Sequence, residues 1–274
     1  MLKTQRPELP LALQTELDKR QHAVDAGQAG DSPWDDFSKH KSRHELKEIL
    51  QTMFHHKCAY CEGIDPRQIE HYWPKSPHSH NARKGTSARM FLWDNILLAC
   101  GTCNGLECKA SRMEWYDGDK PKLINPCQDD PLCYLDVNLM QGPQIRWGFI
   151  WPRAGLSQDN SDRAKYTIKR LKLNLRDGLR QARADAIDNF ILVVDILNKF
   201  GPDYEAPSGR TVRERLLDML DPSKPYLAAI RQILFFEPDH ADLRQQLLAH
   251  VPELKAKLDA WALPPQDCTE NSPG

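Results

Sequence analysis

The sequence predicts an α+β protein in which a small segment with short strands is set in a predominantly helical chain. Apolar residues recur at helical spacing before residue 54 and again from residue 162 onward. Residues 55–122 differ, because they combine short apolar runs with many polar, aromatic, Gly and Pro residues. Two Cys-x-x-Cys pairs fall in this middle segment, and that spacing is typical of structural zinc sites.

Size and composition are those of an ordinary globular protein. A chain of 274 residues makes one large domain or two small ones, and its 40% hydrophobic residues suffice for a core without disulfides. No apolar run approaches the roughly 20 residues that span a bilayer. Residues 1–14 lack the apolar core and cleavage site of a signal peptide. We therefore expect a cytoplasmic protein without membrane association.

The flanking regions are expected to be helical. In the N-terminal helical segment, residues 1–54, the apolar spacing predicts helices at 11–24 and 42–54, separated by a loop at 26–36. The C-terminal helical region, residues 123–262, opens with turn residues and a short hairpin through 143–151. Its helices are expected at 162–183, 185–200, 210–221, 224–236 and 240–261. Residues 263–274 have the composition of a disordered tail.

The cysteine spacing predicts a zinc site. Four of the eight cysteines form the two pairs, and these are Cys58, Cys61, Cys100 and Cys103. The other four share no spacing, and these are Cys108, Cys127, Cys133 and Cys268. In a reducing cytosol such pairs are metal ligands rather than a disulfide framework, and four thiolates complete a tetrahedral Zn²⁺ site. The 38 residues between the pairs (62–99) exceed the gap of a zinc ribbon, so the intervening chain has a task of its own.

The residues in and after this insertion match a known motif set. Glu70-His71, Asn95 in Trp-x-Asn, and Asn104 directly after the last cysteine occur in that order. The pattern resembles the HNH endonucleases, in the branch where two Cys-x-x-Cys knuckles brace a ββα-metal active site. The resemblance covers about a fifth of the chain. It implies that residues 55–122 form an HNH nuclease core with a structural zinc ion.

The resemblance implies a role for each motif residue in phosphodiester hydrolysis. His71 is the general base, and a neutral imidazole is suited to take a proton from water. Glu70 and Asn104 hold a divalent cation, Mg²⁺ or another, because oxygen donors suit hard cations. Asn95 is not a ligand but braces the loop that carries His71. Glu70 and His71 alternate along a strand, so a twisted strand end is needed to present both to one site.

One departure from the family pattern concerns the basic residues. The family often places a Lys three residues after the last motif residue, whereas Lys109 follows Asn104 by five. The candidate nucleic-acid contacts are Lys75 and Lys109, and for Lys109 the family's role is carried over across this shift in position. Cys108 also lies in this stretch between Asn104 and Lys109. On a helix beginning near Asn104, it is not expected to be a zinc ligand.

A narrower resemblance extends over about two thirds of the chain. Five sequence segments resemble the HNH proteins of Septu-type anti-phage systems, which are also found as effectors of some retrons. These segments are RPELP, CAYCE, IEHYWPKS, FLWDNILLACGTCN and TIKRLKLNLRDGLRQAR. That family implies a nuclease working beside an ABC-type ATPase, with nucleic acid as substrate and DNA favoured over RNA. The alternative is a catalytically silent zinc-finger adaptor that binds nucleic acid or recruits the ATPase.

Charge leaves the mode of nucleic-acid binding open. The formal net charge is −1, so positive charge must be concentrated locally or supplied by a partner. Arg83, Lys84 and Arg89 could touch phosphate or be solvated, while His78 and His80 fit a polar loop better than a metal site. The expected helix 162–183 carries eight basic residues, which form either a nucleic-acid-facing surface or a solvated face. Its apolar residues Ile168, Leu171, Leu175 and Leu179 are expected in the core, as is the run 189–197.

Overall fold

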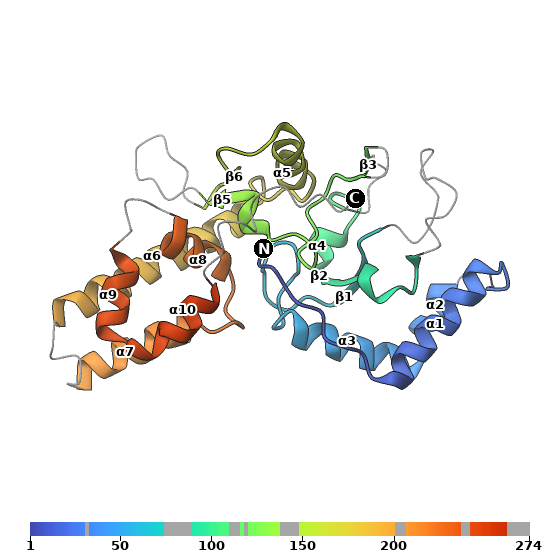
Figure 1. Ribbon diagram of the computed structural model, residues 1–274, viewed down its shortest axis with the longest axis horizontal. Coiled ribbons are helices and arrows are strands. Elements are labelled where there is room, and N and C mark those ends of the chain that lie inside the picture. Colours follow the sequence, from blue (N-terminus) through green and yellow to red (C-terminus); the bar gives the residue numbers. More distant parts are fainter. Residues whose placement is uncertain are drawn as a thin grey trace. The chain divides into compact units, whose positions relative to one another are not determined.

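The computed structural model describes residues 1–30, 33–73, 89–109, 116–117, 120–137, 148–200, 207–236 and 242–261. The chain divides into two compact units (Figure 1). One unit is Lys3–Asp129, here called the N-terminal unit. The other comprises Met1–Leu2 and Asp130–Gly274, here called the C-terminal unit. Each unit is described by itself.

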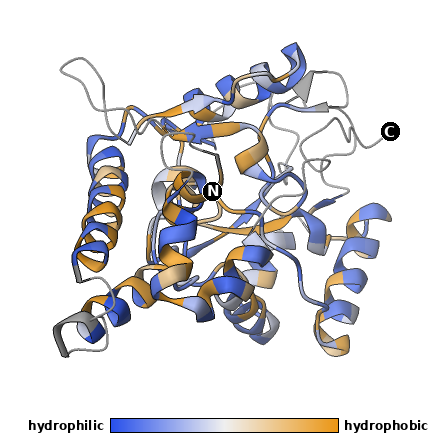
Figure 2. Cartoon of the chain, turned by 60° about the vertical axis from the view of Figure 1, so that its left-hand side comes forward, coloured by the Kyte–Doolittle hydropathy of each residue, from blue (hydrophilic) through white to orange (hydrophobic). Residues whose placement is uncertain are grey.

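Three helices open the N-terminal unit: α1 (Leu11–Asp25), α2 (Pro33–Ser38) and α3 (Lys41–Met53). Helix α3 begins where the His40 ring accepts a hydrogen bond from the Ser42 amide at 3.2 Å, and its Leu46 and Leu50 are fully buried. It packs against α1 and α2. Such helices carry hydrophobic residues on one side and hydrophilic residues on the other (Figure 2), so burying one side is what stabilises them.

Helix α2 lies where the sequence predicted a loop, and that prediction was wrong from Pro33 onward. Proline fits the first position of a helix. Two acidic residues, Asp35 and Asp36, occupy the first turn, where their negative charges interact favourably with the helix dipole. Trp34 and Phe37, three residues apart, are both buried. Tertiary packing of these two rings therefore stabilises a helix too short to form alone.

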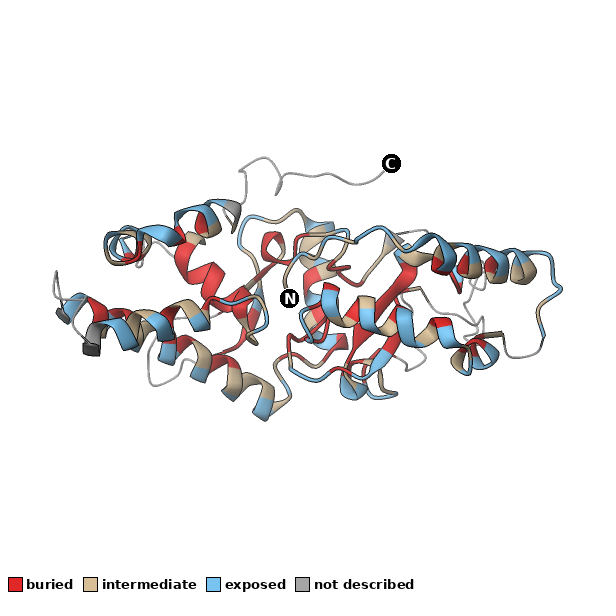
Figure 3. Cartoon of the chain, turned by 90° about the horizontal axis from the view of Figure 1, so that it is seen from below, coloured by how far each residue is buried: buried red, intermediate tan, exposed pale blue. Residues whose placement is uncertain are grey.

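The insertion between the two cysteine pairs contains an antiparallel strand pair. Strand β1 (Gln68–His71) pairs with β2 (Ile96–Ala99), with Glu70 opposite Leu97 and His71 opposite Ile96. The 3₁₀ turn η2 (Trp93–Asn95) leads into β2, and the short helix α4 (Gly101–Asn104) follows it. All four residues of β2 are buried, and Figure 3 shows buried residues concentrated in strands and along one side of the helices. Strands β3 (Tyr116–Asp117) and β4 (Lys120–Pro121) form a second small pair.

The C-terminal unit is mainly helical with one strand pair. The 3₁₀ turn η3 (Pro131–Cys133) precedes β5 (Leu135–Val137), which pairs with β6 (Ile150–Pro152). The remaining elements are α5 (Gln158–Arg170), α6 (Asp177–Phe200), α7 (Pro207–Met219), α8 (Leu227–Phe236), α9 (Leu243–His250), η6 (Pro252–Leu254) and α10 (Lys255–Trp261). Among the described helices of the whole chain, none combines the length and apolar character that crossing a membrane requires.

The single helix expected at 162–183 is two helices, α5 and α6, so this prediction was wrong. Helix α5 ends at Arg170 in a Schellman turn: the Lys172 amide donates to the Lys169 carbonyl, and the Leu173 amide donates to the Ile168 carbonyl. Lys172 takes the left-handed conformation (φ 49°) that this turn requires. Asn174 then hydrogen-bonds both backbone groups of Ile150 in β6, at 2.7 and 2.8 Å.

The break changes which residues of this stretch face the core. Leu171 is buried as expected, but Leu175 is 74% exposed. Two of the eight basic residues, Arg170 and Arg183, are buried, and Arg183 donates to the carbonyls of Gly148 and Leu173. The run 189–197 buries only one side of α6, and Leu192 is 56% exposed. Two of the eight basic residues therefore lie inside the fold, and the other six are half-buried or exposed.

Candidate metal centre and active site

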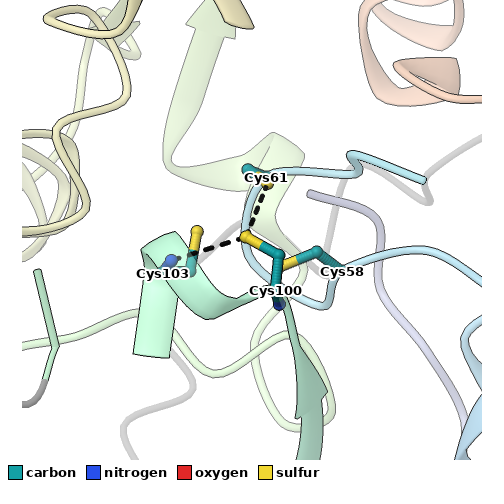
Figure 4. A group of neighbouring side chains, drawn as sticks. All are labelled: Cys58, Cys61, Cys100 and Cys103. Atoms are coloured by element: carbon teal, nitrogen blue, oxygen red, sulfur yellow. Dashed lines mark hydrogen bonds between the residues drawn. The ribbon is translucent and has the colours of Figure 1, made fainter. Parts of the chain in front are cut away.

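The four paired cysteines converge at the end of the β1–β2 pair (Figure 4). Cys58 and Cys61 lie in a tight turn closed by a 2.8 Å hydrogen bond from the Cys58 amide to the Gly63 carbonyl. The Ala59 amide donates to the Leu98 carbonyl at 2.9 Å, which attaches this turn to β2. Cys100 follows β2 and Cys103 lies on α4. The predicted pairing of the two knuckles into one cluster is thus confirmed.

The spacing of the sulfur atoms fits a zinc ion. The four Sγ atoms lie within 4.8 Å of one another, and those of Cys61 and Cys100 are 3.8 Å apart. Tetrahedral Zn²⁺ with Zn–S bonds of about 2.3 Å places its sulfurs roughly 3.8 Å apart. The Cys100 amide donates to Cys58 Sγ at 3.3 Å, and the Cys103 amide donates to Cys100 Sγ at 3.4 Å. Burial raises the pKa of the Cys58 thiol, so a cation is needed to hold this group as thiolate.

Cys108 is buried but does not belong to the metal cluster. The sequence placed it on a helix beginning near Asn104, whereas α4 ends at that residue. The chain turns at Gly105, where a Cβ atom would lie only 2.7 Å from the Gly101 carbonyl oxygen. Glycine is therefore required for this turn. The turn directs Lys109 back toward β1.

The Glu70 carboxylate is buried beside a lysine. It forms an ion pair with Lys109 and accepts a 3.1 Å hydrogen bond from the Tyr60 hydroxyl, both at Oε1. The exposed fractions of the Lys109 and Glu70 side chains are only 4% and 5%. Burial raises the pKa of Glu70, although Lys109 and Tyr60 act in the opposite direction. Lys109 Nζ also donates to the His71 carbonyl, so this side chain holds the end of β1 at two points.

The His71 ring lies among different neighbours. Its Nε2 is 2.9 Å from the Met90 carbonyl oxygen, and its ring meets Trp34 of α2 edge-to-face with centroids 4.2 Å apart. A carbonyl can only accept, so Nε2 carries the proton and the lone pair of the neutral ring is on Nδ1. His71 is 7% exposed. The His71 ring contacts Met90 and Trp34, whereas the Glu70 carboxylate contacts Lys109 and Tyr60. The two residues alternate along β1.

Asn95 is fully engaged with the backbone. Its Oδ1 accepts from the Trp73 amide at 2.6 Å, while its Nδ2 donates to the carbonyls of Trp73 (3.1 Å) and Arg89 (2.7 Å). Asn95 is 1% exposed. It therefore links the residues on either side of the segment 74–88.

Asn104 lies at the end of α4, which contacts β1. Its Nδ2 donates to Gln68 Oε1 at 3.0 Å. Gln68 precedes Glu70 by two residues, so the two share one side of β1. No contact between Asn104 and Glu70 is found. Of the remaining candidates, Lys75, His78, His80 and Cys268 lie outside the described residues.

Arg6 is a structural residue of this site that sequence reasoning did not find. Its guanidinium donates to the carbonyls of Trp93 (2.6 Å), Asp94 (2.9 Å) and Ile96 (2.9 Å) and lies over the Trp93 ring. Arg6 thereby fixes the turn that presents Asn95. Arg6 belongs to the RPELP segment of the family resemblance, but that segment did not indicate which carbonyl groups the arginine binds. Tyr60 and Trp34 were likewise missed, since their partners lie far away in sequence.

Fold and cluster together define a mixed α/β protein with a four-cysteine centre that suits structural zinc. No known family profile matches the chain. The chain is similar to the Septu protein PtuB of Bacillus mycoides (strain KBAB4), with 26% identity over 225 residues, which cover 69% of this chain and 72% of that protein. This similarity supports a relationship to the Septu-type family.

Proposed function

We propose that this protein is an HNH-type endonuclease that hydrolyses nucleic-acid phosphodiester bonds with a divalent cation, and that it serves in anti-phage defence. The observation that carries the proposal is the placement of Glu70-His71 on a strand pair that the cysteine cluster braces directly. Similarity to Septu protein PtuB supports the defence setting.

His71 acts as general base in this proposal. The Met90 carbonyl fixes the protonated nitrogen as Nε2, and the ring of Trp34 restricts rotation of the imidazole. The lone pair of Nδ1 then takes the proton from the attacking water. Both contacts hold the ring in one orientation before substrate binds, and such preorganisation lowers the cost of reaching the reactive geometry.

Glu70 and Asn104 would hold the divalent cation, which when bound stabilises negative charge on the phosphate and the leaving oxygen. Their oxygen donors suit Mg²⁺. Gln68 binds Asn104 from the side of β1 that Glu70 shares, so both donors approach the same side of the strand. Because Lys109 and Tyr60 both contact Oε1, we assign Oε2 to the cation. Lys109 is then an internal counter-ion of Glu70 rather than a phosphate contact.

The zinc ion and Asn95 have supporting tasks. Four cysteine ligands saturate a tetrahedral zinc ion and leave no open position for a substrate. The zinc ion therefore holds β2 and α4 in place. Asn95 holds Trp73 and Arg89, and through them the strand end on which His71 lies.

The partner we propose is an ABC-type ATPase encoded with the nuclease, as in Septu-type systems. The net charge of −1 supports it, because a partner would supply the binding surface that the chain lacks in bulk. DNA is the favoured substrate.

The second candidate function is a zinc-finger adaptor without catalysis. The buried pair of Glu70 and Lys109 favours it, because a carboxylate neutralised by a lysine is also found at purely structural positions.

Cleavage assays separate the two functions. Plasmid, single-stranded DNA and tRNA are incubated with Mg²⁺ and either the wild type or His71→Ala, in the presence and absence of the ATPase. A nuclease cuts at least one substrate, and the substitution abolishes the cut. Absence of cleavage even with the ATPase identifies an adaptor, and equal cleavage by both proteins removes His71 from the mechanism.

A further inference from the structure

Arg89 and Trp73 form a stacked pair close in the chain to residues that contact the proposed general base. The Arg89 guanidinium lies over the Trp73 ring, 4.8 Å from its centroid. The buried Asn95 side chain binds the backbones of both residues, so these hydrogen bonds hold the two residues side by side. Arg89 is exposed and Trp73 is half-buried.

The position of this pair relative to His71 follows from the chain. Trp73 lies two residues beyond His71, just after the end of β1, and Met90, whose carbonyl accepts from the His71 ring, directly follows Arg89. A ligand of the Arg89 guanidinium would therefore lie close to the imidazole.

The charge of Arg89 is not neutralised within the described residues. No carboxylate in that part of the chain forms an ion pair with it, whereas Arg67, another exposed arginine of the N-terminal unit, pairs with Asp65 at 2.5 Å. A guanidinium stacked on an aromatic ring keeps its N–H edge directed outward, and its planar fork matches the oxygens of a phosphate.

We propose that Arg89, oriented by Trp73, binds a backbone phosphate of the nucleic acid next to the bond that is cleaved. The inference rests on the proposed function and gives its substrate a defined contact. Arg89 is one of three basic residues that the sequence alone left equivalent; the other two, Arg83 and Lys84, lie outside the described residues.

Binding to the cleavage-deficient His71→Ala protein tests the proposal. Fluorescence anisotropy with a labelled DNA duplex, a single-stranded DNA and a single-stranded RNA is measured from 50 to 300 mM salt, in the full chain. We expect the added substitution Arg89→Gln to weaken binding to the preferred ligand about tenfold. Loss of one phosphate contact should also reduce the slope of log Kd against log salt by about 0.9 for duplex DNA or about 0.7 for a single strand.

Two further variants give the control and the conservative change. Arg67→Gln removes the same charge at a site already paired with Asp65 and should leave affinity and slope unchanged. Arg89→Lys keeps the charge, so it should preserve the slope while losing part of the affinity.

The outcomes distinguish this inference from the nuclease proposal. Unchanged affinity and slope for Arg89→Gln, or no binding to any of the three ligands, overturns the phosphate contact whether or not the wild type cleaves. Weaker binding with a reduced slope supports the contact even if the wild type shows no cleavage, in which case the nuclease proposal alone fails.

Discussion

Replacing Lys109 by Met should destabilise the N-terminal unit strongly. The substitution keeps a similar apolar volume but removes the ammonium that pairs with Glu70 and donates to the His71 carbonyl. The Glu70 carboxylate would remain in a site where the side chain is only 5% exposed, with the Tyr60 hydroxyl still donating to it. A buried charge without its counter-ion is costly because the interior solvates it poorly.

The expected loss is about 3–5 kcal/mol of unfolding free energy, the usual cost of breaking a buried pair from one side. At roughly 2–4 °C per kcal/mol, the thermal midpoint should fall by about 6–20 °C. The matched control is Lys255→Met, which removes a lysine of 71% exposure from its pair with Asp259. Exposed pairs contribute about 0–1 kcal/mol, so this control should stay close to the wild type.

Urea unfolding of the zinc-loaded proteins measures both variants, and a double-mutant cycle with Glu70→Gln isolates the pair itself. We expect a coupling free energy of about 2 kcal/mol or more between the two positions. If Glu70 is a cation ligand, Mg²⁺ should stabilise Lys109→Met more than the wild type, because the carboxylate then lacks a competing cation. A loss below about 1 kcal/mol, equal to that of Lys255→Met, would refute the buried ion pair.

Two other substitutions test the scaffold. Cys103→Ser should lose zinc and with it the cooperative unfolding of the N-terminal unit, since structural zinc contributes folding free energy directly; a well-folded, zinc-free variant in metal analysis and circular dichroism would contradict this. Asn95→Ala should keep its zinc but lose about 2–4 kcal/mol, because three hydrogen bonds from its buried side chain to the backbones of Trp73 and Arg89 are lost. The exposed Asn189→Ala on α6 should change stability by no more than about 0.5 kcal/mol, and an equally small effect at Asn95 would show that it braces nothing.

What the sequence could predict was set by local spacing. The cysteine cluster is recoverable because a Cys-x-x-Cys turn brings two sulfurs together wherever it occurs, and only the meeting of the two turns needs the fold. The alternation of Glu70 and His71 follows in the same way from strand geometry.

The features that were missed depend on contacts between distant residues. Helix α2 forms because Trp34 packs on His71 and Phe91, and no propensity of six residues indicates that packing. The turn after α5 places a lysine, Lys172, at the left-handed position where glycine is the usual signal, so no residue type at this point indicated the end of a helix. Lys109 reaches Glu70 only because the chain reverses at Gly105.

The central claim is that the cysteine cluster is structural and that His71 at the end of β1 is catalytic. Measuring zinc content and cleavage on one preparation of His71→Ala tests this claim most directly. His71 is not a member of the four-cysteine cluster, so the variant should bind one zinc ion per chain and unfold like the wild type. Cleavage with Mg²⁺ should nevertheless fall at least about 100-fold, the usual minimum contribution of a general base. Cleavage at the wild-type rate by the zinc-loaded variant would contradict the assignment of His71 as the base.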